Sequence, residues 1–122
     1  MIKGSVNFNE ARIRLKVIGK HGREQVIEAV IDTGYSSSLT LPPSLIAQLG
    51  LSWQDVGRAE LADGNVCVFD VFEAQVIWDG KIRKITVDES DADSLVGMKL
   101  LRGHELKMQV RSRGKVTIKR LR

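Results

Sequence analysis

Asp32 is followed by Thr33 and Gly34, and this tripeptide comes directly after the apolar run 29–31. Such a run is typical of a strand that is covered on both faces, so the carboxyl group of Asp32 follows a buried strand. Burial opposes the ionisation of a carboxyl group. Gly34 allows a tight loop to turn the carboxyl group outward and allows backbone N–H groups to approach it. Asp-Thr-Gly also occurs in ordinary turns, so its meaning depends on the elements around it.

Alternating polar and apolar residues dominate the chain and predict strands with one buried face. Pro42 and Pro43 begin a predicted helix that Gly50 ends, because proline is tolerated in a first turn and glycine favours a helix end. Asp-Gly pairs at 63–64 and 79–80 predict hairpin turns. The predicted strands are 2–8, 11–18, 25–31, 39–41, 58–62, 65–78, 82–87, 105–110 and 115–121, with a second short helix within 98–103. We expect an all-β fold, a small closed or partly closed barrel with one or two short helices.

Four segments, in this order, resemble the single-domain retropepsin-like aspartic proteases of clan AA, which include retroviral proteases and bacterial relatives. They are the strand and loop 29–34, the strand and helix 39–51, the hairpin tip 62–65 and the apolar segment 95–101. The second segment is similar to bacterial members in particular. The resemblance implies a single retropepsin-like protease domain over residues 1–122, with a substrate-covering flap hairpin near residues 60–68.

The resemblance implies an aspartic endopeptidase that hydrolyses peptide bonds of a polypeptide substrate with a water molecule activated by two carboxylates. Two carboxylates about 3 Å apart share a proton, so that one acts as base and the other as acid. The chain has one Asp-Thr-Gly, and no other acid has a similar context. The site therefore requires a homodimer in which each subunit contributes Asp32. We expect no metal and no cofactor.

The catalytic residues implied by the resemblance are Asp32, Thr33 and Gly34. In the family, the threonine braces the partner's loop, and the apolar pair and glycine near residue 96 pack against the catalytic loop. The residues expected to bind substrate are Tyr35, Ala62, Asp63, Gly64, Asn65, Val96 and Gly97. Tyr35 departs from the alanine or serine usual in the family, and Ser36 or Ser37 would then have to supply the hydrogen bond that a serine gives to the aspartate.

In retroviral members the two chain ends interleave into a sheet between subunits. The resemblance makes residues 115–121 and 2–8 candidates for that role here. The acidic residues 88–93 are expected to form a solvated loop. Cys67 is the only cysteine, so it forms no disulfide within the chain, and we expect it to be a small buried apolar residue.

Charge is distributed unevenly along the chain. The net charge is +4, whereas residues 99–122 hold nine Lys or Arg and one acid, so the remainder carries −4. A basic segment is also found in nucleic-acid-binding proteins. In residues 99–122, however, the charges alternate with apolar residues, as in a half-exposed strand. Aromatic residues, on which bases stack, make up only 5% of the chain. A nucleic-acid partner is therefore not expected.

Two alternatives to the protease stay open at this point. One is a non-catalytic peptide-binding or dimerisation module of the same fold, and the other is a basic barrel that binds nucleic acid. No stretch approaches the ~20 apolar residues of a membrane span. Residues 1–20 lack the apolar core of a signal peptide. We therefore expect a cytoplasmic protein with no membrane partner.

Overall fold

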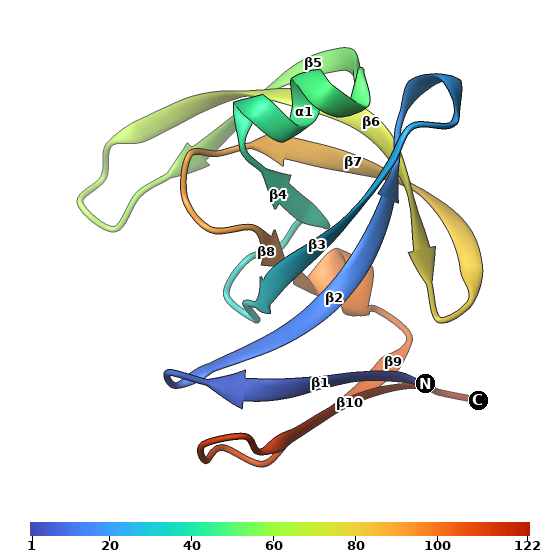
Figure 1. The fold of residues 1–122 in the computed structure, drawn as a ribbon. Helices are drawn as coiled ribbons and strands as arrows, with labels where there is room; N and C mark the ends of the chain where they lie inside the picture. Colours follow the sequence, from blue (N-terminus) through green and yellow to red (C-terminus); the bar gives the residue numbers. More distant parts are fainter.

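The computed structural model describes residues 1–122 and confirms the expected all-β fold with short helices (Figure 1). The strands are β1 (Ile2–Asn7), β2 (Glu10–Ile18), β3 (Glu24–Ile31), β4 (Leu39–Leu41), β5 (Ser52–Glu60), β6 (Val66–Trp78), β7 (Lys81–Glu89), β8 (Leu95–Val96), β9 (His104–Met108) and β10 (Lys115–Arg120). The helices are α1 (Pro43–Leu49) and α2 (Met98–Leu101), and a 3-10 turn covers Lys20–Gly22. Neither α-helix is long and apolar enough to cross a membrane.

The strands β6, β7, β4, β8, β3 and β2 close into a ring, because β2 pairs with β6 as well as with β3. This ring is the partly closed barrel that we expected. On one side β5 extends the sheet from β6, and on the other β1, β10 and β9 extend it from β2. In Figure 1, β1 and β10 lie below the ring as a separate ribbon layer.

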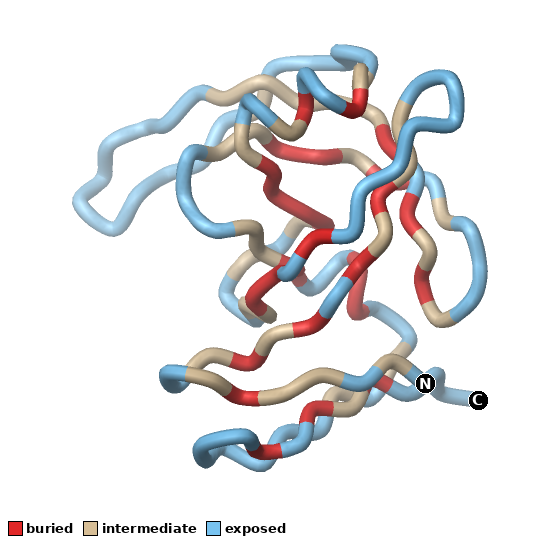
Figure 2. Tube along the Cα trace, viewed as in Figure 1, coloured by how far each residue is buried: buried red, intermediate tan, exposed pale blue.

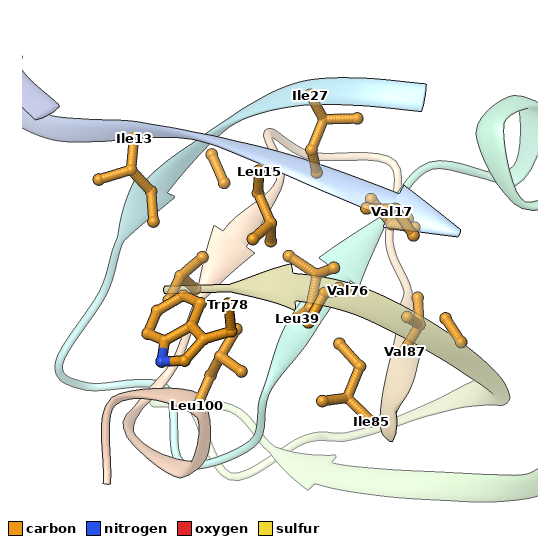
Figure 3. Close-up of a cluster of buried hydrophobic side chains, with 14 of the residues drawn as sticks. Ile13, Leu15, Val17, Ile27, Leu39, Val76, Trp78, Ile85, Val87 and Leu100 are labelled. Carbon is orange, nitrogen blue, oxygen red and sulfur yellow. The ribbon is translucent and has the colours of Figure 1, made fainter. Parts of the chain in front are cut away.

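One hydrophobic core fills the ring, because alternate residues of its strands point inward. On β2, Ile13, Leu15 and Val17 are buried, whereas Arg14 between them is exposed. Figure 3 shows these three side chains together with buried residues from β4, β6 and β7. Figure 2 shows the same division along the whole chain, with buried segments inside the ring and exposed ones in the hairpins.

Two local predictions are confirmed in detail. Helix α1 has Pro43 in its first turn and ends at Gly50, which adopts a left-handed conformation with φ of 61°. The Asp79-Gly80 pair joins β6 to β7, and both residues have positive φ, as a tight hairpin turn requires.

The hairpin of β5 and β6 differs from the prediction, because β5 begins at Ser52 and the connection covers residues 61–65 rather than two residues. The Asp63 side chain explains the longer turn. Its carboxylate accepts hydrogen bonds from both the backbone and the side-chain nitrogen of Asn65, each at 2.9 Å. Figure 1 shows the hairpin projecting from the barrel, and almost all of its outer half is exposed.

The predictions for Cys67 and Asp88 are wrong. Cys67 is exposed, because it lies on the part of β6 that stands clear of the barrel. Asp88 does not lie in a solvated loop, because β7 continues to Glu89 and pairs with β6 on one side and β4 on the other. Asp88 is therefore buried within the sheet, with 8% of its surface exposed.

The terminal strands also depart from expectation. β10 lies between β1 and β9, and β1 lies between β10 and β2, all in antiparallel pairs. Both edges of each strand are thus occupied within one chain, so neither is free to interleave with a partner. The free edge of this layer belongs to β9.

Candidate active site

Asp32 stands directly after β3, at the point where the chain leaves the sheet. Its backbone N–H still donates to the Val96 carbonyl of β8 at 2.9 Å, so its Cα position is fixed by the barrel. Its carboxylate accepts a hydrogen bond from the Gly34 N–H at 2.8 Å, on the exposed side of the loop. This backbone donor holds the Asp32 carboxylate in one orientation within the loop.

Hydrogen bonds from the end of β8 and the start of α2 hold the loop that follows Asp32. The N–H groups of Gly97, Met98 and Lys99 donate to the carbonyls of Ser38, Tyr35 and Ser37, at 2.9, 2.8 and 3.2 Å. These bonds satisfy N–H groups that a helix start leaves without partners inside the helix. Loop and helix start are therefore one hydrogen-bonded unit.

Val96 and Gly97 are both buried beneath this loop. A Cβ added to Gly97 would lie 2.1 Å from the Ser37 carbonyl oxygen and 2.6 Å from that of Tyr35. Val96 and Gly97 thus support the loop from inside the barrel. We expected them to contact substrate, and their burial differs from that expectation. Their burial agrees with the packing role that the sequence resemblance implied.

Tyr35 turns its side chain inward and connects the loop to the barrel. Its hydroxyl donates to the Asp88 carboxylate at 2.5 Å and lies 3.4 Å from the Leu39 carbonyl. Burial of the ring, and then the hydrogen bond to Asp88, raise the pKa of the Tyr35 phenol above its ordinary value. The hydroxyl is therefore protonated and available as a donor at neutral pH. Sequence reasoning missed Asp88, because its partner lies 53 positions away.

A Tyr35→Phe variant is expected to lose about 1–3 kcal/mol of unfolding free energy, because it leaves the buried Asp88 carboxylate without its donor. Urea denaturation of the two proteins measures this difference. The double variant Tyr35→Phe/Asp88→Leu is expected to recover part of the loss, because both polar partners are then gone. Equal stability of Tyr35→Phe and wild type would show that the hydrogen bond does not stabilise the fold.

No protein-family model matches the chain, and no curated protein matches it. Among solved structures, the chain is similar to the crystal structure of a retropepsin-like aspartic protease from Rickettsia conorii, with a TM-score of 0.57 and 17% sequence identity. The superposition covers 94% of this chain and 87% of that one. This chain has the retropepsin-like fold. At this identity the likeness establishes the fold, and activity is a separate question.

Within this retropepsin-like fold, the predicted flap residues lie together at the tip of the β5–β6 hairpin. Residues 62–65 are all exposed, and none forms a hydrogen bond with the loop after β3. In the view of Figure 1, hairpin and loop lie on the same side of the ring. The hairpin also exposes the apolar residues Leu61, Val66 and Val68, each at least half accessible.

Beside the loop that follows β3 lies a hollow of about 620 Å³. Thr33 and Ser36 line it from the loop, Met98 from α2 and Leu106 from β9. Neither Ser36 nor Ser37 donates to the Asp32 carboxylate, whose donor within the loop is Gly34. Leu106 was not singled out from the sequence, where it is one apolar residue in an ordinary strand pattern.

The Asp32 carboxylate has no second carboxylate bonded to it within the chain. Asp63 is bonded to Asn65, Asp70 to Trp53, Asp79 to the N-terminal amine and Asp88 to Tyr35. No carboxylate or other side chain is hydrogen-bonded to the Asp32 side chain. No group of three or more His, Cys, Asp or Glu side chains is placed to hold a metal ion.

Proposed function

We propose that this protein is an aspartic endopeptidase of the retropepsin-like type, active as a homodimer. The observation that carries the proposal is the Asp32 carboxylate, held by the Gly34 N–H in an Asp-Thr-Gly loop at the end of β3, in a retropepsin-like fold. The active site would combine Asp32 of one subunit with the partner's Asp32. Residues 1–122 would form one protease domain.

Chemistry at such a site follows from the sharing of one proton. Two carboxylates about 3 Å apart do not both ionise readily, so the pair is singly protonated over a range of pH. The ionised carboxylate takes a proton from a water molecule, which attacks the scissile carbonyl. The protonated carboxylate polarises that carbonyl and later gives its proton to the departing nitrogen. Acid and base are thus the same residue type in two protonation states.

Thr33 and the flap complete the proposed site. Thr33 is exposed at the loop tip, where its hydroxyl is available to brace the partner's loop. The flap, residues 61–65 with the adjoining strand ends, would close over an extended peptide and exclude water from the carboxylates. Residues 62–65 would then contact the substrate backbone, and Val66 and Val68 offer apolar surface to its side chains. The Tyr35 ring would contact substrate only at the part of it that the barrel leaves uncovered.

The test is cleavage of a peptide library between about pH 4 and 7, where a shared carboxylate pair is singly protonated. We expect cleavage that a peptide mimic with a hydroxyl group at the scissile position blocks, because this hydroxyl takes the place of the attacking water. Activity per chain should also fall on dilution, because the monomer holds half of the site. Binding of the mimic without cleavage at any pH would favour the non-catalytic module. Cleavage that the mimic does not affect would refute the carboxylate mechanism.

A further inference from the structure

A second hollow, of about 330 Å³, lies between the β6–β7 turn, the connection from α2 to β9 and the end of β10. In Figure 1 these three segments are on the same side of the molecule, near the two chain ends. The hollow contains no residue of the loop after β3, and it shares only residues 102–104 with the hollow beside Thr33. Its volume falls in the range of small-ligand sites, about 300–1,000 Å³.

This hollow is strongly basic. Lys81 and Arg83 line it from β7, Arg102 from the connection after α2, and Arg120 from β10. None of these four side chains forms an ion pair. The hollow has one acid, Asp79, whose carboxylate is already bonded to the N-terminal amine. Four cations and one acid give the lining a net charge of +3, which concentrates positive potential in a concave surface.

Two hydrogen bonds of His104 fix the connection that carries Arg102. The indole N–H of the buried Trp78 donates to Nε2 of His104 at 3.3 Å. An indole is only a donor, so Nε2 is the acceptor and Nδ1 holds the ring proton, which it donates to the Arg102 carbonyl at 3.1 Å. The Arg83 guanidinium is fixed as well, because its Nη1 donates to the Leu100 carbonyl at 3.0 Å. The site is thus partly ordered before a ligand binds, which lowers the entropic cost of binding.

We propose that this basic hollow binds the phosphate chain of a small ligand, either a nucleoside triphosphate or free polyphosphate. A phosphate chain carries several negative charges in a small volume, which matches the net charge of the lining. Its tetrahedral groups accept hydrogen bonds from many directions, as cations on three separate segments require, whereas a carboxylate accepts mainly in its own plane. Apolar contacts would add little, because the lining has only two apolar residues, Ile82 and the buried Trp78.

Calorimetric titration of the full chain with inorganic tripolyphosphate at low ionic strength tests the site. We expect one bound molecule per chain, and an affinity at least about tenfold lower in Arg102→Gln/Arg120→Gln, which lacks two of the four cations. Arg111→Gln/Arg113→Gln is the matched control, because it removes the same charge from exposed residues outside the hollow. It should bind within about twofold of wild type. No binding by the wild type, or an equal loss in both double variants, would refute the site.

Citrate and adenosine triphosphate test the chemical class of the ligand. Citrate is a tricarboxylate, and we expect it to bind at least about tenfold more weakly than tripolyphosphate, because its planar groups accept from fewer directions. Equal binding of citrate would overturn the assignment to phosphate. Adenosine triphosphate distinguishes the two sources: binding at least as tight as that of tripolyphosphate supports a nucleotide, and a lack of binding supports free polyphosphate.

The two tryptophans of the chain report where tripolyphosphate binds. The indole N–H of Trp78 is bonded to His104, which lines the hollow, so its NMR signal should shift on titration. Trp53 is the internal control, because its indole donates to Asp70 at 3.1 Å and it does not line the hollow. An equal shift of both signals, or a shift of Trp53 alone, would place the ligand elsewhere and refute the proposal.

Melting curves show whether Arg102→Gln/Arg120→Gln is folded, and we expect it to be, because both side chains are exposed. If it does not fold, Lys81→Gln at the exposed start of β7 takes its place and should weaken binding about threefold or more. Unchanged binding by Lys81→Gln would then refute the site. These titrations involve no peptide, so their result does not depend on the proposed protease activity.

Discussion

An Asp32→Asn variant is expected to fold as the wild type does and to lose peptide cleavage by about 10³-fold or more. Asparagine has nearly the same shape and still accepts the Gly34 N–H bond at its side-chain oxygen. It has no proton to share and does not take one from water near neutral pH. In a homodimer the substitution removes the acid and the base together. Cleavage rates on a fluorescent peptide, with melting curves of both proteins, measure the effect.

Asp91→Asn is the matched control, because Asp91 is an exposed aspartate in a loop and has no side-chain hydrogen bond. We expect it to cleave as wild type does, although its change in charge is the same. If Asp32→Asn retained wild-type activity, the proposed chemistry would be wrong. A folded, inactive Asp32→Asn protein that still binds the hydroxyl-bearing mimic weakly would agree with it.

Mixing Asp32→Asn with the wild type tests whether two chains form one active site. A ninefold excess of Asp32→Asn leaves only about a tenth of wild-type chains paired with each other, if subunits exchange at random. Activity per wild-type chain should therefore fall about tenfold. Two independent active monomers would show no such decrease. The experiment separates a site made by two chains from one that each chain completes alone.

The position of the Asp32–Gly34 loop at the end of β3 was predictable from the sequence because its signals are local. A buried strand, a carboxyl group and a glycine follow one another within a few positions, and the Asp79-Gly80 turn is defined in the same way. The two short helices were also visible, since Pro43 and Gly50 mark the start and end of α1. These features depend on backbone preferences of single residues, which tertiary contacts do not overrule here.

The features that were missed depend on pairing between distant segments. Asp88 looked like the first residue of an acidic loop, and it is buried because β4 pairs with the end of β7 and Tyr35 reaches its carboxylate. The alternating pattern of 115–121 showed a strand but not its neighbours. That β1 and β9 occupy both of its edges is a property of the topology. Which strand is left for a partner is therefore readable only from the fold.

Gly97→Ala is expected to destabilise the fold by about 3 kcal/mol and to abolish cleavage, although it adds a single methyl group. Gly97 has a φ of −103°, a conformation open to any residue, so backbone strain is not what requires glycine here. Space is the reason. The new Cβ would overlap the carbonyl oxygens of Ser37 and Tyr35, which accept the N–H bonds of Lys99 and Met98. These carbonyl groups must shift to make room for the Cβ, and the loop that holds Asp32 then moves with them.

Gly22→Ala is the opposite case and serves as the control. Gly22 has a φ of 71° and nothing within 4 Å of its added Cβ, so alanine there meets strain but no overlap. We expect it to cost about 1 kcal/mol and to leave cleavage unchanged. Urea denaturation and cleavage rates of the two variants distinguish the effects. If Gly97→Ala kept its stability and activity, the close packing of β8 and α2 against the loop after β3 would not be what positions Asp32.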